Sequence, residues 1–170
     1  MSTLFWQDDR LTKLFPLPPA KNPPLRLLAQ FNRTFTEHLL EGVYEAPDRQ
    51  MWIALACIPP VAREHHYSLA SVDESGKATF SIFSARHQQT VLKRPLPRWI
   101  RVAAKALVIT HELGLEVSGF VGMVAGDEPE GPRYDYALGI LFAALAFDFC
   151  GLAYSQQQIT EIADAASRIS

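Results

Sequence analysis

The sequence predicts an α+β fold, with a mixed β-sheet and helices packed on one face of it. Strand-like patterns come first. Two apolar runs, over residues 67–72 and 78–83, flank a polar turn that contains Gly76, as in a β-hairpin. Helical patterns dominate only after residue 97, which favours this layout over a doubly wound parallel sheet. At 170 residues, 48% of them hydrophobic, the chain can bury one core.

The first strand-rich part follows a proline-rich arm, and we expect the arm over residues 1–25 and a single domain over residues 26–170. Proline fixes φ and removes an N–H donor, so the arm is expected to be extended. From Arg26 to Tyr44 the apolar residues recur every three or four positions and also alternate, so helix and strand both remain open. A short apolar run from Met51 to Ile58, closed by two prolines, predicts a buried strand.

The second part alternates helices with one more strand. Apolar residues between Trp99 and Ile109 share a helical face, and Gly114 suits the C-terminal end of that helix. Residues 115–124 predict a strand, and residues 136–149, apolar almost all round, predict a central buried helix. Ser155 is placed to cap a last amphipathic helix.

The charge balance excludes several classes of protein. With 16 Lys and Arg against 18 Asp and Glu, nothing indicates binding to nucleic acid or to an anionic membrane. The N-terminus lacks the features of a signal peptide, and no apolar run reaches the roughly 20 residues of a membrane span, so we expect a cytoplasmic protein. Cys57 and Cys150 lie in apolar runs without metal-ligand spacing, which predicts buried, reduced thiols.

The most informative segment is an acidic turn between the strand over 115–124 and the helix over 136–149. Glycines and prolines before a helix are typical of an anion-binding turn. This turn carries four carboxylates and one nearby arginine, and Pro132 removes an N–H donor; the charged residues are Asp127, Glu128, Glu130, Arg133 and Asp135. The charge would repel a phosphate. A plain solvated connection, with Asp135 as the N-cap of the next helix, remains the alternative.

From residue 97 onward the sequence resembles the N-terminal domain of galactokinase and of the GHMP small-molecule kinase superfamily. The resemblance rests on Pro97-Arg98-Trp99, Gly114-Leu115, Ser118-Gly119-Phe120 and the turn that starts at Gly126, and it extends more weakly back to residue 26. It implies the GHMP kinase N-terminal fold, also described as ribosomal protein S5 domain 2-like.

The nucleotide loop of that family is degenerate in this chain. The family pattern is Gly-x-x-Pro-x-Gly-x-Gly-Leu-Ser-Ser-Ser-Ala-Ala, and an ungapped alignment keeps only Gly126, Pro129 and Gly131. The second loop glycine falls on Arg133, and the serines fall on Asp135, Tyr136 and Ala137. A side chain where glycine admits the phosphate, and a carboxylate where hydroxyls bind it, should weaken ATP binding.

Other family sites have little or no counterpart. The sugar-site motif, Pro-Gly-Arg followed by Gly-Glu-His-Thr-Asp-Tyr, has a weak echo in Arg33, Glu37 and His38, with a shorter spacing and no Asp-Tyr after the histidine. The segment that carries the family's catalytic aspartate, and its C-terminal domain, have no counterpart. We expect no catalytic residue. We expect no metal at Glu64, His65 and His66 either, because neighbours on a strand point to opposite faces.

These observations predict a pseudoenzyme: a non-catalytic, galactokinase-like domain without a cofactor that binds a partner protein or a small ligand. The alternative is a divergent or split sugar kinase that needs a second chain together with ATP and magnesium. A purely structural interaction module is a third hypothesis. We also expect a homodimer, because the C-terminal domain of the family covers apolar surface that would otherwise be exposed.

Overall fold

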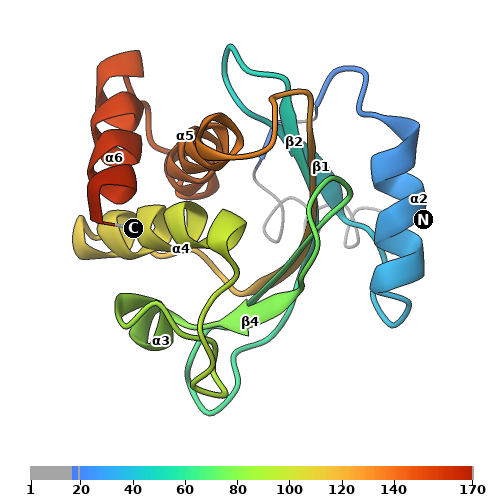
Figure 1. Cartoon of the computed structure of the whole chain (residues 1–170), viewed down its shortest axis with the longest axis horizontal. Helices are drawn as coiled ribbons and strands as arrows, with labels where there is room; N and C mark the ends of the chain where they lie inside the picture. The colour runs from blue at the N-terminus through green and yellow to red at the C-terminus, as the bar shows by residue number, and fades with distance from the viewer. Residues whose placement is uncertain (1–16, 19, 170) are drawn as a thin grey trace, which may run out of the picture.

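The computed structural model describes residues 17–18 and 20–169. One five-stranded sheet has the spatial order β1-β2-β5-β3-β4 (Figure 1). Its strands are β1 (Gly42–Glu45), β2 (Met51–Cys57), β3 (Tyr67–Ser71), β4 (Ala78–Phe80) and β5 (Phe120–Gly126). The helices are α2 (Leu25–Thr34), α3 (Ile82–Arg86), α4 (Arg98–Glu112), α5 (Pro132–Phe149) and α6 (Gln156–Ile169).

The sheet is mixed, as the sequence predicts. β1, β2 and β5 are antiparallel neighbours, β5 runs parallel to β3, and β3 and β4 form the expected antiparallel hairpin. Tyr67 pairs with Phe120, and Ser71 pairs with Val124. Because β3 and β5 are parallel, their carboxyl ends lie at the same edge of the sheet, which positions the candidate site.

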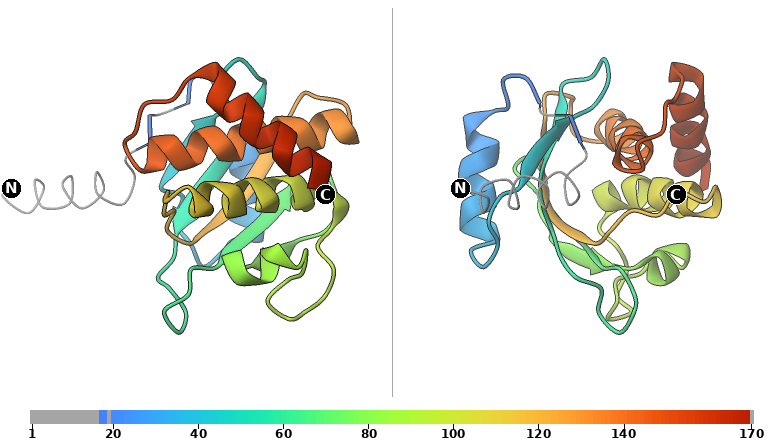
Figure 2. Two further views of the ribbon diagram at one scale, coloured as in Figure 1. Left: turned by 90° about the vertical axis from the view of Figure 1, so that its left-hand side faces the viewer. Right: turned by 180° about the vertical axis from the view of Figure 1, so that it is seen from behind.

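Helices cover both faces of the sheet, which corrects the expected one-sided layout. Figure 2 shows α3, α4, α5 and α6 on one side and α2 alone on the other. The first six residues of β2 and all of β5 are buried, and such strands need cover on both faces. α2 supplies the second cover by burying Leu27 and Phe31, which also resolves the helix-or-strand ambiguity of this segment.

The larger of the two cores lies between the sheet and α4, α5 and α6. α5 is buried over most of its length, as its apolar sequence predicts. Gly139 lets α5 approach its neighbours closely, since a Cβ there would lie 2.9 Å from Val102 Cγ1 and 3.4 Å from Ala163 Cβ. The smaller core, beneath α2, includes Trp52, Val121 and Met123.

Several expected element boundaries shift for local reasons. β4 ends at Phe80 because Ser81 and Ser84 form a reciprocal capping box that starts α3. β5 begins only at Phe120. α5 begins at Pro132, with Gly131 as its N-cap at φ 112°, so Asp135 lies inside the helix and is not its cap.

Other local predictions are confirmed. Gly114 follows α4 at φ 93°, in the left-handed region that favours glycine. At α6, the Ser155 hydroxyl accepts the Gln158 N–H at 3.1 Å, and the Gln158 side chain accepts the Ser155 N–H at 2.7 Å. Cys57 and Cys150 form no disulfide in the part of the chain that the structure describes, and both are partly buried and not fully buried as expected.

The described end of the arm lies against its own domain. Leu17 packs on the larger core, and the Ala20 N–H donates to Val43 O of β1 at 3.1 Å. The rest of the predicted arm, residues 1–16 and 19, lies outside the described residues. In the described ranges, no helix combines the length and the apolar character needed to cross a membrane.

Candidate functional site

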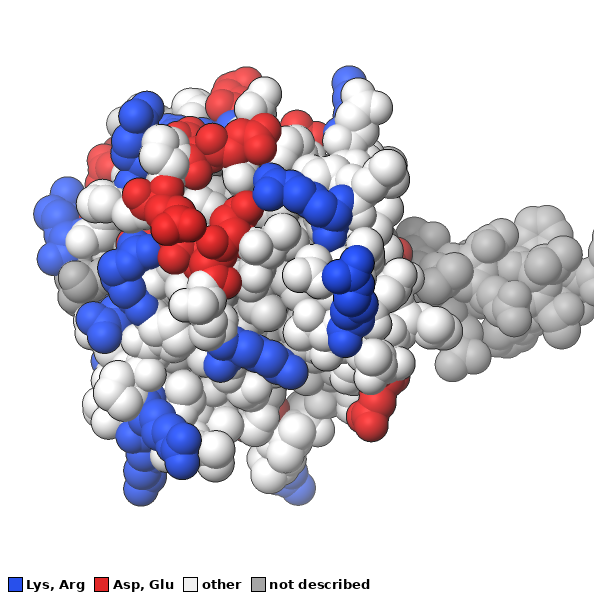
Figure 3. Space-filling view, turned by 45° about the vertical axis from the view of Figure 1, so that its right-hand side comes forward, with Lys and Arg blue, Asp and Glu red and all other residues white. Residues whose placement is uncertain are grey.

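The acidic turn lies where the topology favours a ligand site. It joins the carboxyl end of β5 to the start of α5, beside the turn that follows β3. Open sheets with parallel strands commonly bind ligands at this edge. In Figure 3 acidic side chains gather in one patch, with Lys and Arg side chains around it. Several of these charges are joined in ion pairs.

Asp73 connects three elements around the turn. Its Oδ2 accepts the Gly126 N–H at 2.8 Å and the Tyr134 hydroxyl at 3.0 Å. Its Oδ1 accepts from Arg26 Nη1 at 2.9 Å. The Tyr134 hydroxyl also lies 2.7 Å from Ser71 Oγ, at the end of β3. One carboxylate therefore fixes the end of β5, the first turn of α5 and the start of α2.

Asp135 forms a second centre with Arg98. The Arg98 guanidinium, at the first residue of α4, pairs with Asp135 and, at 2.9 Å, with Glu74 Oε2. The Asp135 side chain is only 10% exposed. Burial raises the pKa of Asp135, and the hydrogen bond and charge of Arg98 offset part of that rise. Among the residues that the structure describes, the buried Asp135 Oδ1 has no hydrogen-bond partner.

Arginines from distant segments reach the other carboxylates of the turn. Arg26 lies 3.5 Å from Asp127, and Arg49 lies 3.7 Å from Glu128. The sequence suggested that Arg133 alone opposed the acidic charge, whereas the structure brings three other arginines to it. Arg133 and Glu130 are both exposed. Ion pairs therefore balance part of the acidic charge of the turn.

The glycines of the turn have packing and backbone roles. A Cβ on Gly126 would lie 2.4 Å from Met51 Sδ, so this glycine allows β5 to pass β2 closely. At the start of α5 the backbone has a positive φ, and glycine is the residue that adopts it most readily, as Gly131 does. Pro132 then takes the first helical position and leaves one N–H fewer at that end. Tyr136, on which the second serine of the family pattern falls, donates to Asp164 Oδ1 of α6 at 2.8 Å.

The structure does not bring the echo of the sugar motif to this turn. Arg33 lies near the carboxyl end of α2, and its Nη1 lies 3.4 Å from Gln30 Oε1 of the same helix. Glu37 and His38 follow that end, and Glu37 is exposed. It is Arg26, at the opposite end of α2, that contacts the turn.

His65 and His66 lie next to different glutamates. His65 Nε2 lies 3.5 Å from Glu116, and His66 Nε2 lies 3.5 Å from Glu64. His65 Nδ1 accepts the Gly119 N–H at 3.2 Å. Over the described residues, no three His, Cys, Asp or Glu side chains converge to hold a metal ion.

Sequence reasoning missed the residues that organise the site: Arg26, Asp73 and Arg98. In the sequence, Asp73 has no feature beyond its place in the turn of a hairpin, and Arg98 has none beyond its place at the start of a helix. No spacing in the sequence relates them, because their contacts join segments 24 to 101 residues apart. The sequence matches no family model and no curated protein, so the likeness to galactokinases rests on the residues quoted above.

Proposed function

We propose that this chain is a non-catalytic domain of the galactokinase-like, GHMP kinase N-terminal type, which acts by binding a partner protein or a small ligand. The observation that carries the proposal is the ion pair between the buried Asp135, in the first turn of α5, and the exposed Arg98, at the first residue of α4. Asp135 stands where the nucleotide loop of the family has its first serine.

The pair places a built-in anion where a phosphate would otherwise be attracted. A helix N-terminus favours negative charge, and the Asp135 carboxylate supplies it within the first turn. An incoming triphosphate would meet this carboxylate together with Asp127 and Glu128. It would also have to compete for arginines that are already paired.

The proposed fold type is supported by the order of the elements. A strand, a turn with the Pro129 and Gly131 of the family pattern, and two helices follow one another as in the family. Pro97-Arg98-Trp99 opens α4, as the resemblance implies.

Calorimetry with Mg-ATP and with pyrophosphate tests the proposal. We expect no binding by the wild type at about 1 mM ligand. Asp135→Ser should gain pyrophosphate binding, because it frees Arg98 while removing a carboxylate. Glu130→Ser is the matched control, since it removes one exposed charge from the same turn without freeing an arginine, and it should gain much less.

A triple variant extends the test. Arg133→Gly with Asp135→Ser and Tyr136→Ser restores the family pattern at three loop positions and should gain nucleotide affinity without phosphorylating galactose. Tight Mg-ATP binding by the wild type that Arg98→Ala abolishes would contradict the proposal. That result would favour the split sugar kinase instead.

A further inference from the structure

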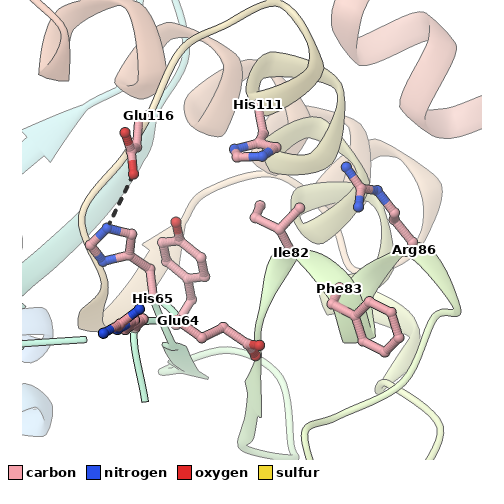
Figure 4. Close-up of a pocket in the computed structure, with 9 residues that line it drawn as sticks. Glu64, His65, Ile82, Phe83, Arg86, His111 and Glu116 are labelled. Atoms are coloured by element: carbon pink, nitrogen blue, oxygen red, sulfur yellow. Dashed lines mark ion pairs between the residues drawn. The ribbon is translucent and has the colours of Figure 1, made fainter. Parts of the chain in front are cut away.

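A second cavity lies at the other end of β3, β5 and α4 from the acidic turn. Its volume is about 250 Å³, and four segments line it: the turn before β3, α3, the last turn of α4 and the approach to β5. Figure 4 shows the Glu116–His65 pair on one side of this cavity and His111 and Arg86 on the other. We call it the Tyr67 cavity, after the buried ring in its wall.

One wall of the Tyr67 cavity is apolar. Tyr67 is 2% exposed, and its hydroxyl donates to Val117 O at 2.5 Å, so its ring forms the buried back of this wall. Ile82 and Phe83 of α3 continue this wall. Phe83 is 65% exposed, which is unusual for a large aromatic side chain beside a cavity. A flat or branched apolar group would cover it.

The acidic groups of the cavity already have partners. Glu116 faces His65 Nε2, and Glu64 faces His66 Nε2, each at 3.5 Å. Because His65 Nδ1 accepts the Gly119 N–H, the proton of the neutral imidazole is on Nε2, directed at Glu116. By contrast, Arg63 and Arg86 form no ion pair within the described part of the chain. Among the described residues, Arg63 and Arg86 are therefore the cationic groups of the cavity that have no carboxylate partner, and they are the groups with which an anionic ligand would pair.

A strained turn, closed by two backbone hydrogen bonds, forms the rim of the cavity. Ala62 and Arg63 have φ of 51° and 68°, between two hydrogen bonds of 2.8 and 2.9 Å that join Val61 and Glu64. Two consecutive positive φ values make a turn of the type that normally takes Asn-Gly. Such strain in residues other than glycine concentrates at binding and catalytic sites. Here it sets the position of Arg63 at the cavity.

We propose that the Tyr67 cavity binds a small organic anion, with an anionic head group on a single aromatic ring or a branched apolar body. The head group pairs with Arg86, with His111 beside it and Arg63 at the rim, and the body covers Tyr67, Ile82 and Phe83. A guanidinium suits both a carboxylate and a phosphate ester. The volume fits a body of one ring.

This inference goes beyond the proposed function and does not depend on it, because the acidic turn lies at the opposite end of the shared elements. The Mg-ATP titration examines that turn, whereas the experiment below examines the Tyr67 cavity. The Mg-ATP titration can contradict the proposed function without bearing on the Tyr67 cavity, and the reverse also holds.

Four probes separate the two halves of the proposed ligand: phenylacetate, phenyl phosphate, benzyl alcohol and inorganic phosphate. Each probe is titrated into the full chain, and binding is measured from the chemical shifts of the backbone amides in NMR spectra. We expect saturable binding of phenylacetate or phenyl phosphate, with shifts at Gly119 and at α3, and the tighter of the two assigns the head group. Benzyl alcohol lacks the charge and inorganic phosphate lacks the ring. The affinity of each should therefore be at least about tenfold lower than that of the organic anion.

Three variants assign the contacts. Arg86→Gln should weaken the organic anion about tenfold and leave benzyl alcohol unchanged, because only the charge contact is lost. Phe83→Ala should weaken both. Arg94→Gln, which removes an exposed arginine outside this cavity, is the matched control and should change neither. Circular dichroism checks that each variant is folded. Absence of saturable binding up to about 10 mM, or anion binding that Arg86→Gln leaves intact, would overturn the proposal.

Discussion

Asp73 is the residue on which the acidic turn depends most. Its carboxylate accepts from the Gly126 N–H, the Tyr134 hydroxyl and Arg26. Asp73→Ala would leave the amide and the hydroxyl without their acceptor in a place where the aspartate itself is only 15% exposed. We expect a loss of about 2–4 kcal/mol in the free energy of unfolding, measured with urea.

The control for Asp73 is an acidic residue of the same turn without these contacts. Glu130→Ala removes an exposed carboxylate and should stay within about 0.5 kcal/mol of the wild type. If both variants lose the same small amount, Asp73 does not organise the turn.

Glu41 should give the fold a measurable pH dependence. Burial raises its pKa above the ordinary value of 4.5, although the Cys57 N–H, which donates to Oε1 at 2.8 Å, lowers it. The folded state then binds the proton more readily than the unfolded state. Its contribution to stability is therefore present below 4.5 and is lost as pH rises through the raised pKa.

Glu41→Gln removes this titration and keeps an acceptor for the Cys57 amide. The free energy of unfolding of the variant minus that of the wild type should increase as pH rises from about 4 to about 8. Urea unfolding of both proteins across that range measures the difference. A difference that does not vary with pH would show that burial of Glu41 has no energetic effect.

At the scale of elements, Gly119 determines how closely β5 passes the start of β3. A Cβ there would lie 2.5 Å from the His66 carbonyl oxygen, which belongs to a backbone that cannot easily move. That oxygen also accepts the Phe120 N–H at 3.1 Å, and Gly119 O accepts the Ile58 N–H at 2.9 Å. Gly119→Ala should therefore cost about 1–3 kcal/mol, because these strands would have to separate.

Thermal unfolding measures this cost, and Ser118→Ala next to it is the control that adds no clash. Equal melting temperatures for the two variants would mean that the strands can yield at no cost. The Gly119 change should also disturb the Tyr67 cavity, because it displaces His65, whose Nδ1 accepts the Gly119 N–H.

Elements whose signals are local could be predicted from the sequence. The continuous apolar run of β2, the hairpin around Gly76 and the C-terminal glycine of α4 each contain their own chemical cause. α2 could not be assigned, because its pattern fits two periods and only burial against β2 and β5 decides between them. For the candidate site, the sequence predicts the turn between β5 and α5, whereas Arg26, Asp73 and Arg98 come from segments that meet only in the folded chain.

At the scale of the whole molecule, each edge strand of the sheet accepts a backbone hydrogen bond from a neighbouring segment. Ala20 donates to Val43 O of β1, and Val91 donates to Thr79 O of β4, at 3.1 and 3.0 Å. Exposed strand edges are the usual route to pairing between sheets. Because these two carbonyls are already occupied, we expect a second copy of this chain to associate through side chains and not by extending the sheet.

The exposed leucines favour the side of α2 for such an association. Leu25 is 82% exposed at the start of α2, and Leu39 is 89% exposed in the segment after it. A two-fold axis near α2 would bury each of them twice, which is why we expect the homodimer there. Light scattering over a micromolar concentration series should give a mass near twice 19.0 kDa. Leu39→Glu should shift the mass toward the monomer, whereas Leu92→Glu, at a site 75% exposed beside β4, should not.

We expect the proline-rich arm to lie across the partner in such a dimer, and this expectation needs a separate variant, because part of the arm has a structural role in its own chain. Deleting residues 1–24 would remove Ala20 and uncover the edge of β1, which could itself cause association. Deleting only residues 1–16 leaves that hydrogen bond intact. If the arm lies across the partner, the shorter deletion should weaken the dimer while Leu39→Glu still acts on what remains. An undiminished dimer would place the whole contact on the α2 side, and a monomer at every concentration of the wild type would refute the dimer itself.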